Sequence, residues 1–446
     1  MSITLHRRLL VPAAAAGVIA LALTGCVGDQ TGDTSDIDCA PYEAYGTFEG
    51  EEVTIGGTIQ DTEADRLVES WSDFETCTGI TIDYQGTKEF EAQISVLAEG
   101  GNAPDLGIFP QPGLLQKLAL GGFLQPAPAE VEANVDEFWS EDWKGYGTVD
   151  GTFYAAPLMA SVKGFVWYSP SEFADNGYEI PTTLDELTAL AETIAADSGH
   201  QPWCVGLGSG DATGWPGTDW VEDYVLRQSG PEVYDQWVSH EIPFNDAAIA
   251  EAFDGVGDIL KNPAMVNGGF GDVSTVISTE FGDAGLPILD GQCSLHHQAS
   301  FYEGFWPEGT TVAEDGDVYA FLLPPVATDD PQAVTGGGEF VGAFSSGDAV
   351  TAVLAYLSSD TWANNRVSLG GVISANKGLD PNNASSAILK QAVEILQGDT
   401  TFRFDASDLM PAAVGADSFW KGIVAWVSGN STQQTLDTIE ASWPQD

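Results

Sequence analysis

The chain contains 446 residues, of which 43 % are hydrophobic and 10 % aromatic, so it is long enough for more than one packed unit and apolar enough to bury substantial cores. Its 67 acidic and 14 basic residues give a formal net charge of −53. Such a surface repels phosphate backbones and anionic lipids, which argues against nucleic-acid binding and against membrane docking through a basic patch. Five histidines leave little material for a zinc or iron site, and we expect no metal and no cofactor.

The first residues have the pattern of an export signal. A positive segment, residues 6–8, precedes the apolar stretch 9–23, which is short for a membrane span. This stretch ends in the sequence LTGC, which resembles the bacterial lipobox. We expect residues 1–25 to be a lipoprotein signal peptide, Cys26 to be lipidated and residues 26–50 to be a flexible tether, so that lipid alone holds the protein on the extracytoplasmic side of the cell membrane. An ordinary signal peptide and an uncleaved anchor are the alternatives.

Four cysteines follow Cys26 in the chain, namely Cys39, Cys77, Cys204 and Cys293. An even number outside the cytoplasm favours two disulfides, and four cysteines allow three pairings. Buried free thiols are the competing interpretation, above all for Cys77.

From Glu52 onward the hydrophobic pattern alternates between the periods of strands and helices. The first series predicts a strand from residue 53, a helix capped by Asp61 or Thr62 and running to residue 74, a strand at 80–84, a helix at 90–97 and a strand at 105–109. The second series predicts a strand at 162–169, a helix from 184 to 194 with Thr183 and Glu186 as its capping box, strands at 203–207 and 318–325, and helices at 349–357 and 420–427. This alternation predicts an α/β fold with parallel strands joined by helices.

Five motifs occur in order along the chain: Ala103-Pro104-Asp105-Leu106-Gly107-Ile108-Phe109, Thr213-Gly214-Trp215-Pro216-Gly217-Thr218-Asp219-Trp220, Phe281-Gly282-Asp283-Ala284, Gln298-Ala299-Ser300-Phe301 and Phe402-Arg403-Phe404-Asp405-Ala406-Ser407-Asp408. Together they resemble extracellular solute-binding proteins of the maltose-binding class, and within it the α-glucoside branch that serves ABC importers. The resemblance covers roughly residues 50 to 446.

The resemblance implies a two-lobed, type II periplasmic-binding-protein-like fold. Each lobe would be a mostly parallel sheet flanked by helices, and crossover segments would form a hinge between the lobes. Lobe 1 would comprise residues 51–161 and 318–372, and lobe 2 residues 162–317 and 373–446. We expect the disulfides Cys39–Cys77 and Cys204–Cys293, because each pair then stays within one lobe.

A sugar ring has an apolar face and an edge of hydroxyl groups, so its site needs flat aromatic surfaces and polar side chains around them. The candidate platforms are Phe109, Trp215 and Trp220. Core packing is the alternative for each aromatic, although the neighbouring Gly214, Pro216 and Gly217 favour a loop at Trp215, and Trp220 is expected at a helix start.

The candidate polar contacts are Gln60, Asp61, Gln111, Lys163, Asp219, Asp283, Gln298, Gly337, Arg403 and Asp405. Gln60 and Asp61 stand just after the first strand, where the family often has an aromatic or acidic residue, so a hydrogen bond rather than stacking is expected there. The competing structural roles are a helix N-cap for Asp219, a carboxylate-paired or solvated side chain for Lys163, a flexible loop for the glycines around Gly337 and an Arg–Asp pair between lobes for Arg403.

These observations predict a monomeric binding protein, not an enzyme, that captures an α-glucoside di- or oligosaccharide between its lobes and delivers it to the permease subunits of an ABC importer. A secreted glycoside hydrolase is the alternative, since 67 acids guarantee chance carboxylate pairs, but no glycosidase signature is present. Ser374 and Lys377 match the S-x-x-K pattern of serine acylases, but no K-T-G follows. A purely structural lipoprotein is opposed by the order of the motifs.

Overall fold

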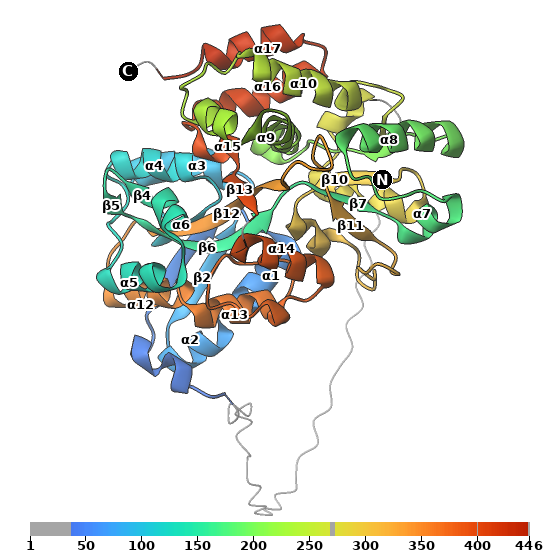
Figure 1. Cartoon of the computed structure of the whole chain (residues 1–446). Helices are drawn as coiled ribbons and strands as arrows, with labels where there is room; N and C mark the ends of the chain where they lie inside the picture. Colours follow the sequence, from blue (N-terminus) through green and yellow to red (C-terminus); the bar gives the residue numbers. More distant parts are fainter. Residues whose placement is uncertain (1–36, 268–272, 399, 445–446) are drawn as a thin grey trace, which may run out of the picture. The chain divides into compact units, whose positions relative to one another are not determined.

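The first of two main sheets has six strands among the residues that the structure describes. The computed structural model describes residues 37–267, 273–398 and 400–444 (Figure 1), and the expected signal peptide and Cys26 lie outside them. The strands of this sheet are ordered β13-β12-β3-β1-β2, and β6 pairs with β12. Their bounds are β1 Glu52–Gly57, β2 Thr81–Gly86, β3 Leu106–Phe109, β6 Ala155–Val162, β12 Ala333–Ala343 and β13 Thr401–Phe404. The predicted parallel pairing of β1 with β2 and β3 is confirmed.

A second sheet has the order β11-β7-β10-β8-β9. Its strands are β7 Phe165–Tyr168, β8 Trp203–Cys204, β9 Val266–Asn267, β10 Leu295–Gln298 and β11 Tyr319–Leu322. The single strand predicted at 162–169 is wrong, because β6 ends in the first sheet and β7 begins in the second. Lys163 and Gly164 make the crossing, and Gly164 has φ +77, a conformation that favours glycine.

Helices cover both sheets, and loops connect these helices to the ends of the strands. The α-helices are α1 Asp61–Glu69, α2 Ser72–Thr78, α3 Phe90–Glu99, α4 Pro112–Leu120, α5 Ala129–Phe138, α6 Glu141–Tyr146, α7 Pro170–Asn176, α8 Leu184–Ser198, α9 Trp215–Val238, α10 Ala247–Leu260, α11 Phe281–Ala284, α12 Asp348–Leu357, α13 Asp360–Ser368, α14 Ala387–Gln397, α15 Ala406–Leu409, α16 Trp420–Val427 and α17 Thr432–Glu440. The short elements are β4 Thr148–Val149, β5 Thr152–Phe153, the 3-10 helices at 40–45, 210–212, 273–277, 286–290, 300–305 and 381–383, and a π-helix at 414–419. Among the described residues, no helix combines the length and apolar character needed to cross a bilayer.

Local signals predicted several helices well. Thr183 caps α8 by accepting a hydrogen bond from the backbone N–H of Glu186, as expected. The single helix predicted from residue 61 is instead two helices, α1 and α2, which are separated at Ser70 and Trp71. Neither Asp61 nor Thr62 caps α1, because the helix already begins at Asp61 and its N-cap Gln60 makes no side-chain capping bond.

The folded unit starts at Cys39, so the predicted flexible tether is wrong for residues 39–50. Tyr42 and Tyr45 pack against Phe74 and Tyr356, with ring centroids 5.5–6.3 Å apart. Aromatic burial therefore fixes this segment, and the disulfide Cys39–Cys77 links it to α2. Both predicted disulfides are present, and the second joins Cys204 to Cys293.

Two segments belong to sheets other than those implied by the predicted lobe boundaries. β11, assigned to lobe 1, pairs with β7 of the second sheet. β13, assigned to lobe 2, pairs with β12 of the first sheet. The preceding helix α14 packs in the same core as the first sheet. These corrections follow from backbone pairing between distant segments, which periodicity does not report. The division of the chain into two lobes stays a proposal.

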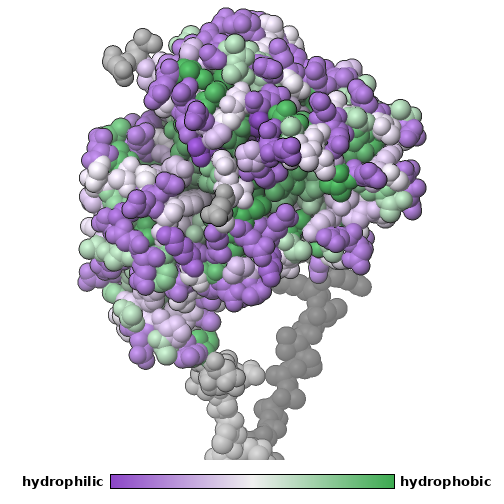
Figure 2. All heavy atoms as spheres, in the orientation of Figure 1, coloured by the Kyte–Doolittle hydropathy of each residue, from purple (hydrophilic) through white to green (hydrophobic). Residues whose placement is uncertain are grey.

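The surface agrees with the composition. Figure 2 shows one face of the molecule, on which hydrophilic residues predominate and apolar residues gather in smaller groups between them. The apolar residues otherwise fill two clusters of buried side chains. The high net negative charge therefore lies on the outside of the fold, with the exception of a few acids described next.

Candidate functional site

A cavity of about 700 Å³ lies among loops that extend from both sheets. Its lining includes the N-terminal ends of α1, α9, α11 and α16, the loop after β3, the crossing at Lys163 and the middle of β12. A second hollow is lined only by residues 431–441 along α17, so it cannot surround a ligand. The cavity between the sheets is therefore the candidate site.

Aromatic rings form one wall of the cavity. Trp215 is the first residue of α9, and its ring lies 5.0 Å from the ring of Phe281 and 6.2 Å from that of Phe301. The ring of Phe305 lies 5.2 Å from that of Phe281, and the buried Trp420 also lines the cavity. Such a wall offers flat apolar surface to the face of a sugar ring.

Gly214 places Trp215 at the cavity. It is the N-cap of α9 with φ +119, and a Cβ there would lie 2.3 Å from the carbonyl oxygen of Trp420. Only glycine satisfies both requirements. The prediction that Trp215 lies in a loop is therefore wrong, since the residue begins α9. Trp215 nevertheless lines the cavity.

A buried lysine forms the polar base of the cavity. Lys163 Nζ lies 2.8 Å from Asp219 Oδ1 and also contacts Asp405 Oδ2. All three side chains are buried, and the ammonium lies 5.5 Å from the ring centroid of Trp215. The lysine comes from the crossing between the sheets, Asp219 from α9, and Asp405 is the N-cap of α15. One cation thus joins three separate parts of the chain.

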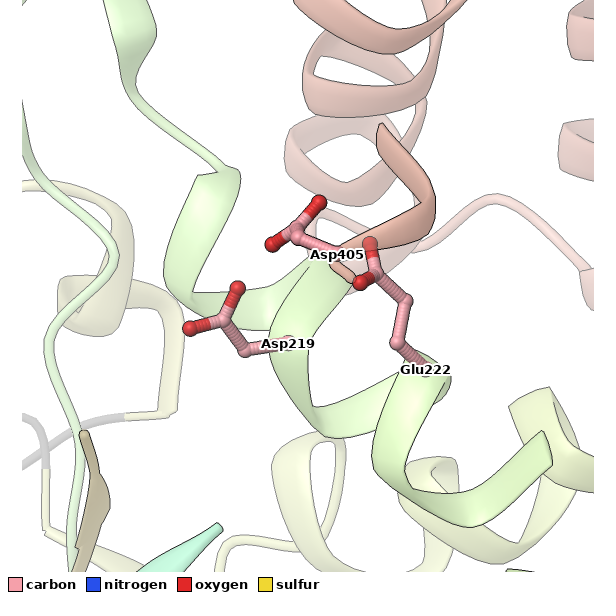
Figure 3. Close-up of side chains that lie close together, drawn as sticks. All are labelled: Asp219, Glu222 and Asp405. Atoms are coloured by element: carbon pink, nitrogen blue, oxygen red, sulfur yellow. The ribbon is translucent and has the colours of Figure 1, made fainter. Parts of the chain in front are cut away.

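The carboxylates around Lys163 already have donors. Figure 3 shows Asp219, Glu222 and Asp405 close together, and their oxygens lie within 4.8 Å of one another, as a metal site would require. However, Lys163 contacts both aspartates, and Glu222 accepts hydrogen bonds from the backbone N–H groups of Ala406 and Ser407 at 2.9 and 3.2 Å. The lysine therefore occupies the place in which a metal ion would neutralise these acids.

The pKa values of Lys163 and Asp219 are raised, whereas that of Asp405 is lowered. Burial favours the neutral form of Lys163, but Asp219 and Asp405 attract the charged form more strongly and raise its pKa well above the usual value. Burial likewise favours neutral Asp405, but Lys163 and hydrogen bonds from Ser407 and the Asp408 N–H lower its pKa. Burial raises the pKa of Asp219 well above its usual range in spite of Lys163. The lysine and Asp405 thus form the permanent ion pair.

Gln111 has unused hydrogen-bonding capacity at the cavity. It precedes α4, lines the cavity and is 2 % exposed, yet neither Nε2 nor Oε1 has a hydrogen-bond partner among the described residues. A buried amide without partners costs free energy, and a pair of ligand hydroxyl groups could satisfy it.

Comparison with known sequences now decides the family. The sequence pattern of the bacterial extracellular solute-binding proteins matches residues 60–363, which is more than half of the chain. The chain belongs to this family. It is a family of binding proteins rather than of enzymes, and its members act outside the cytoplasm.

Two relatives resemble this solute-binding protein over nearly its whole length. The osmoprotective compounds-binding protein GgtB of Synechocystis is 38 % identical over 91 % of this chain and 96 % of its own. The α-glucosides-binding periplasmic protein AglE of Rhizobium meliloti is 37 % identical over 93 % of this chain and 92 % of its own.

Solved structures agree with the predicted fold. The solute receptor AcbH has a TM-score of 0.73 at 20 % identity over 88 % of this chain and 97 % of its own. Maltose-bound MalE3 of T. maritima has a TM-score of 0.69 at 17 % identity over 87 % and 98 %. The type II periplasmic-binding-protein fold expected from the sequence is confirmed.

Eight of the predicted ligand contacts of the solute-binding protein line the cavity: Gln60, Asp61, Gln111, Lys163, Trp215, Asp283, Gly337 and Asp405. Lys163 is also paired with carboxylates, as its alternative proposed. The flexible loop proposed around Gly337 is wrong, because these glycines lie within β12. A Cβ at Gly336 or Gly338 would come within 2.5 Å of the backbone of β6, so close strand packing requires both glycines.

Five predicted contacts do not line the cavity: Phe109, Asp219, Trp220, Gln298 and Arg403. The two aromatics are buried in the cores, where Trp220 packs against His297 with ring centroids 4.2 Å apart. Gln298 Oε1 accepts a hydrogen bond from the N–H of Ala299.

The two charged residues of that group form ion pairs instead. Asp219 lies inside α9, so it is not an N-cap, and it supports the cavity by holding Lys163. Arg403 binds Asp235 through Nε and Nη2, at 2.6 and 2.9 Å. An Arg–Asp pair, the alternative for Arg403, is therefore present, although both residues belong to the predicted lobe 2 and the pair does not join the predicted lobes.

Sequence reasoning missed Phe281, Phe301, Phe305 and Trp420. The motifs that carry the resemblance contain Phe281 and Phe301, so a signal was present for these two. Trp420 was interpreted only as part of an apolar helical stripe. The missing information is that the N-terminal ends of α9, α11 and α16 meet at one cavity.

Proposed function

We propose that this solute-binding protein captures an α-glucoside di- or oligosaccharide in the cavity and delivers it unchanged to the permease subunits of an ABC importer. The observation that carries the proposal is the division of the cavity into two kinds of wall. Trp215 and the phenylalanines offer flat surfaces, while Gln111, Lys163 and Asp405 offer donors and acceptors. This combination suits the apolar face and the hydroxyl edge of a pyranose.

The names of the relatives support a saccharide. AglE is named for α-glucosides, GgtB for osmoprotective compounds, and the solved neighbours include receptors described with galactopyranose, chitin oligosaccharide and maltose. An acidic glycoside hydrolase has no such support, and no chemical step is proposed.

Binding is proposed to shift the protein toward a closed form that the permease recognises. The cavity takes residues from loops of both sheets, so a sugar that contacts both favours the arrangement in which they are close. The crossings at Lys163, between β11 and β12, and after β13 are the proposed hinge. The protein is proposed to act as a monomer.

The lipid anchor is part of the proposal, and it rests on the LTGC sequence that ends at Cys26. The protein is expressed with its own leader in a bacterial host and separated between a detergent phase and an aqueous phase. We expect the native protein in the detergent phase and the Cys26→Ala variant, which cannot be lipidated, in the aqueous phase. A native protein that stays in the aqueous phase would contradict the anchor while leaving the binding function untouched.

The test of the function is the binding of trehalose and maltose to the purified protein and to Trp215→Ala. We expect calorimetry to show binding of at least one of these α-glucosides, and the variant to bind it at least about thirtyfold more weakly, because a central aromatic platform typically contributes about 2 kcal/mol or more. Trp443→Ala is the control, since this residue stacks on His240 away from the cavity. Equal affinities in the wild type and Trp215→Ala would remove this residue from the site, and release of glucose would contradict the absence of chemistry.

A further inference from the structure

Three hydrogen-bonding side chains meet at one corner of the cavity. Glu91 comes from α3, Gln111 precedes α4 and Asp408 lies in α15, and all three line the cavity. The start of α4 packs directly on α15, because a Cβ at Gly113 would lie 2.2 Å from the carbonyl oxygen of Met410 and 3.2 Å from that of Asp408. Glu91 and Asp408 are close enough for their charges to repel each other. We call this set of three residues the acidic corner.

The side chains of the acidic corner have no hydrogen-bond or ion-pair partners among the described residues. Within the described ranges, no residue donates a hydrogen bond to the carboxylate of Glu91 or of Asp408, and neither forms an ion pair within 4.0 Å, whereas Asp405 beside them has both. Gln111, which is 2 % exposed, leaves both polar atoms of its amide unpaired. The buried, unpaired Gln111 amide lies beside two partly buried carboxylates that accept no hydrogen bond from the described residues, and this combination indicates that a ligand group completes the corner.

The charge around the corner selects the kind of group. Nine acidic and three basic residues line the cavity. Two of the bases are already paired, Lys88 with Glu280 and Lys163 with Asp219 and Asp405. The third, Arg66, lies at a different part of the lining, against Gly304 and Gly371. An anionic ligand group would therefore meet an uncompensated excess of negative charge, and a cationic group would reduce it.

The pKa values agree with a shortage of positive charge. Burial raises the pKa of Glu91 to about 7. Burial and then repulsion by Asp405 raise the pKa of Asp408 well above its usual range. A nearby cation would favour the charged form of both groups. A metal ion is a poorer fit than an organic cation, because Glu91 and Asp408 belong to no cluster of three potential ligand residues in the described part of the chain.

We propose that the acidic corner binds a protonated amino group of the ligand, so that an amino-substituted α-glucoside binds more tightly than its neutral counterpart and a carboxylated one binds most weakly. The amine would donate to Glu91 and Asp408 and to the Gln111 carbonyl oxygen. This inference rests on the proposed function and names the ligand class within it.

Three compounds that differ at one carbon test the inference: 6-amino-6-deoxytrehalose, trehalose and trehalose carboxylated at the same carbon. Trehalose is symmetric, so either of its rings can carry the substituent into the corner. By calorimetry at pH 7 and low salt, we expect the amine to bind at least tenfold more tightly than trehalose and the carboxylate at least tenfold more weakly. In Glu91→Gln, which keeps the shape of the side chain, the advantage of the amine should fall below threefold. Glu99→Gln on the same helix is exposed and outside the cavity, and it should keep the full advantage.

The outcomes separate the two proposals. If trehalose binds and the amine binds no more tightly, the inference is overturned while the proposed function stands. If Glu91→Gln and Asp408→Asn, each checked for folding by circular dichroism, both keep the full advantage of the amine, the assignment to the acidic corner is overturned. If none of the saccharides binds, maltose included, the proposed function fails and the inference fails with it.

Discussion

Lys163→Met lowers the free energy of unfolding by about 3–5 kcal/mol at pH 7, which is the expected effect of removing one partner from a buried ion pair. Lys163 is the only basic residue that contacts Asp219 or Asp405 within 4.0 Å in the described part of the chain. Without it, both aspartates remain buried beside Glu222 and Asp408, and their mutual repulsion is uncompensated. Urea unfolding followed by fluorescence and circular dichroism measures the loss.

The effect of Lys163→Met should depend on pH. The raised pKa of Lys163 means that its contribution to stability is fully present below the unfolded pKa of about 10.4 and is lost only as pH rises through the folded value. The pKa values of Asp219 and Asp408 are raised, so these acids take up protons more readily than ordinary aspartates as the pH falls, and this relieves their repulsion in the variant. The difference in unfolding free energy between wild type and Lys163→Met should therefore be smaller at pH 5 than at pH 7.

Lys88→Met is the matched control for Lys163→Met. The Lys88–Glu280 pair is about half exposed on both sides, at 46 % and 45 %, and exposed pairs contribute about 0–1 kcal/mol. Similar losses in the two variants would contradict the assignment of Lys163 as the buried cation that holds the crossing segments together.

The double variant Cys204→Ala/Cys293→Ala is expected to lose about 4–5 kcal/mol of unfolding free energy. The disulfide closes a segment of 89 residues, and the entropy of the unfolded chain regained on opening so long a loop is large. Both cysteines are also buried, so their sulfur atoms leave unfilled volume when they are replaced. The unfolding midpoint in urea, measured under oxidising conditions, gives the loss.

Cys39→Ala/Cys77→Ala provides the comparison for this prediction. Its disulfide spans 38 residues, for which loop entropy alone gives about 4 kcal/mol. Because it ties only the segment 40–45 to α2, proteolysis near the N-terminus should increase in this variant before the rest of the chain unfolds. A smaller loss for Cys204→Ala/Cys293→Ala than for this variant would contradict the dependence on loop length and burial.

Much of the fold could be predicted because its signals are local. The alternation of apolar residues predicted β1, β2, β3, α3 and α12, and the Thr183 cap predicted the start of α8. The break at Lys163 and Gly164 was missed, because an apolar run on either side has the same pattern whether its halves belong to one sheet or two.

The candidate site was predicted in part. Trp215 and Gln111 were predicted because the glycine and proline beside them mark turn-rich loops, and Lys163 because it stands near the proposed crossover. Phe109 and Trp220 were misplaced for a complementary reason. Phe109 precedes Pro110 and Trp220 follows Gly217 by three residues, but both side chains are buried in the cores, and sequence spacing does not report that direction.

The sequence by itself determined the acidity, the even number of cysteines after residue 26, most strands and helices, and a set of motifs specific enough to indicate the family. These properties depend on composition or on residues close together in the chain. Only the tertiary structure decided which aromatics line the cavity, which acids hold Lys163 and which side chains remain unpaired at the acidic corner. Those facts depend on contacts between residues as distant as Lys163 and Asp405, and the burial and charge that result belong to no local segment.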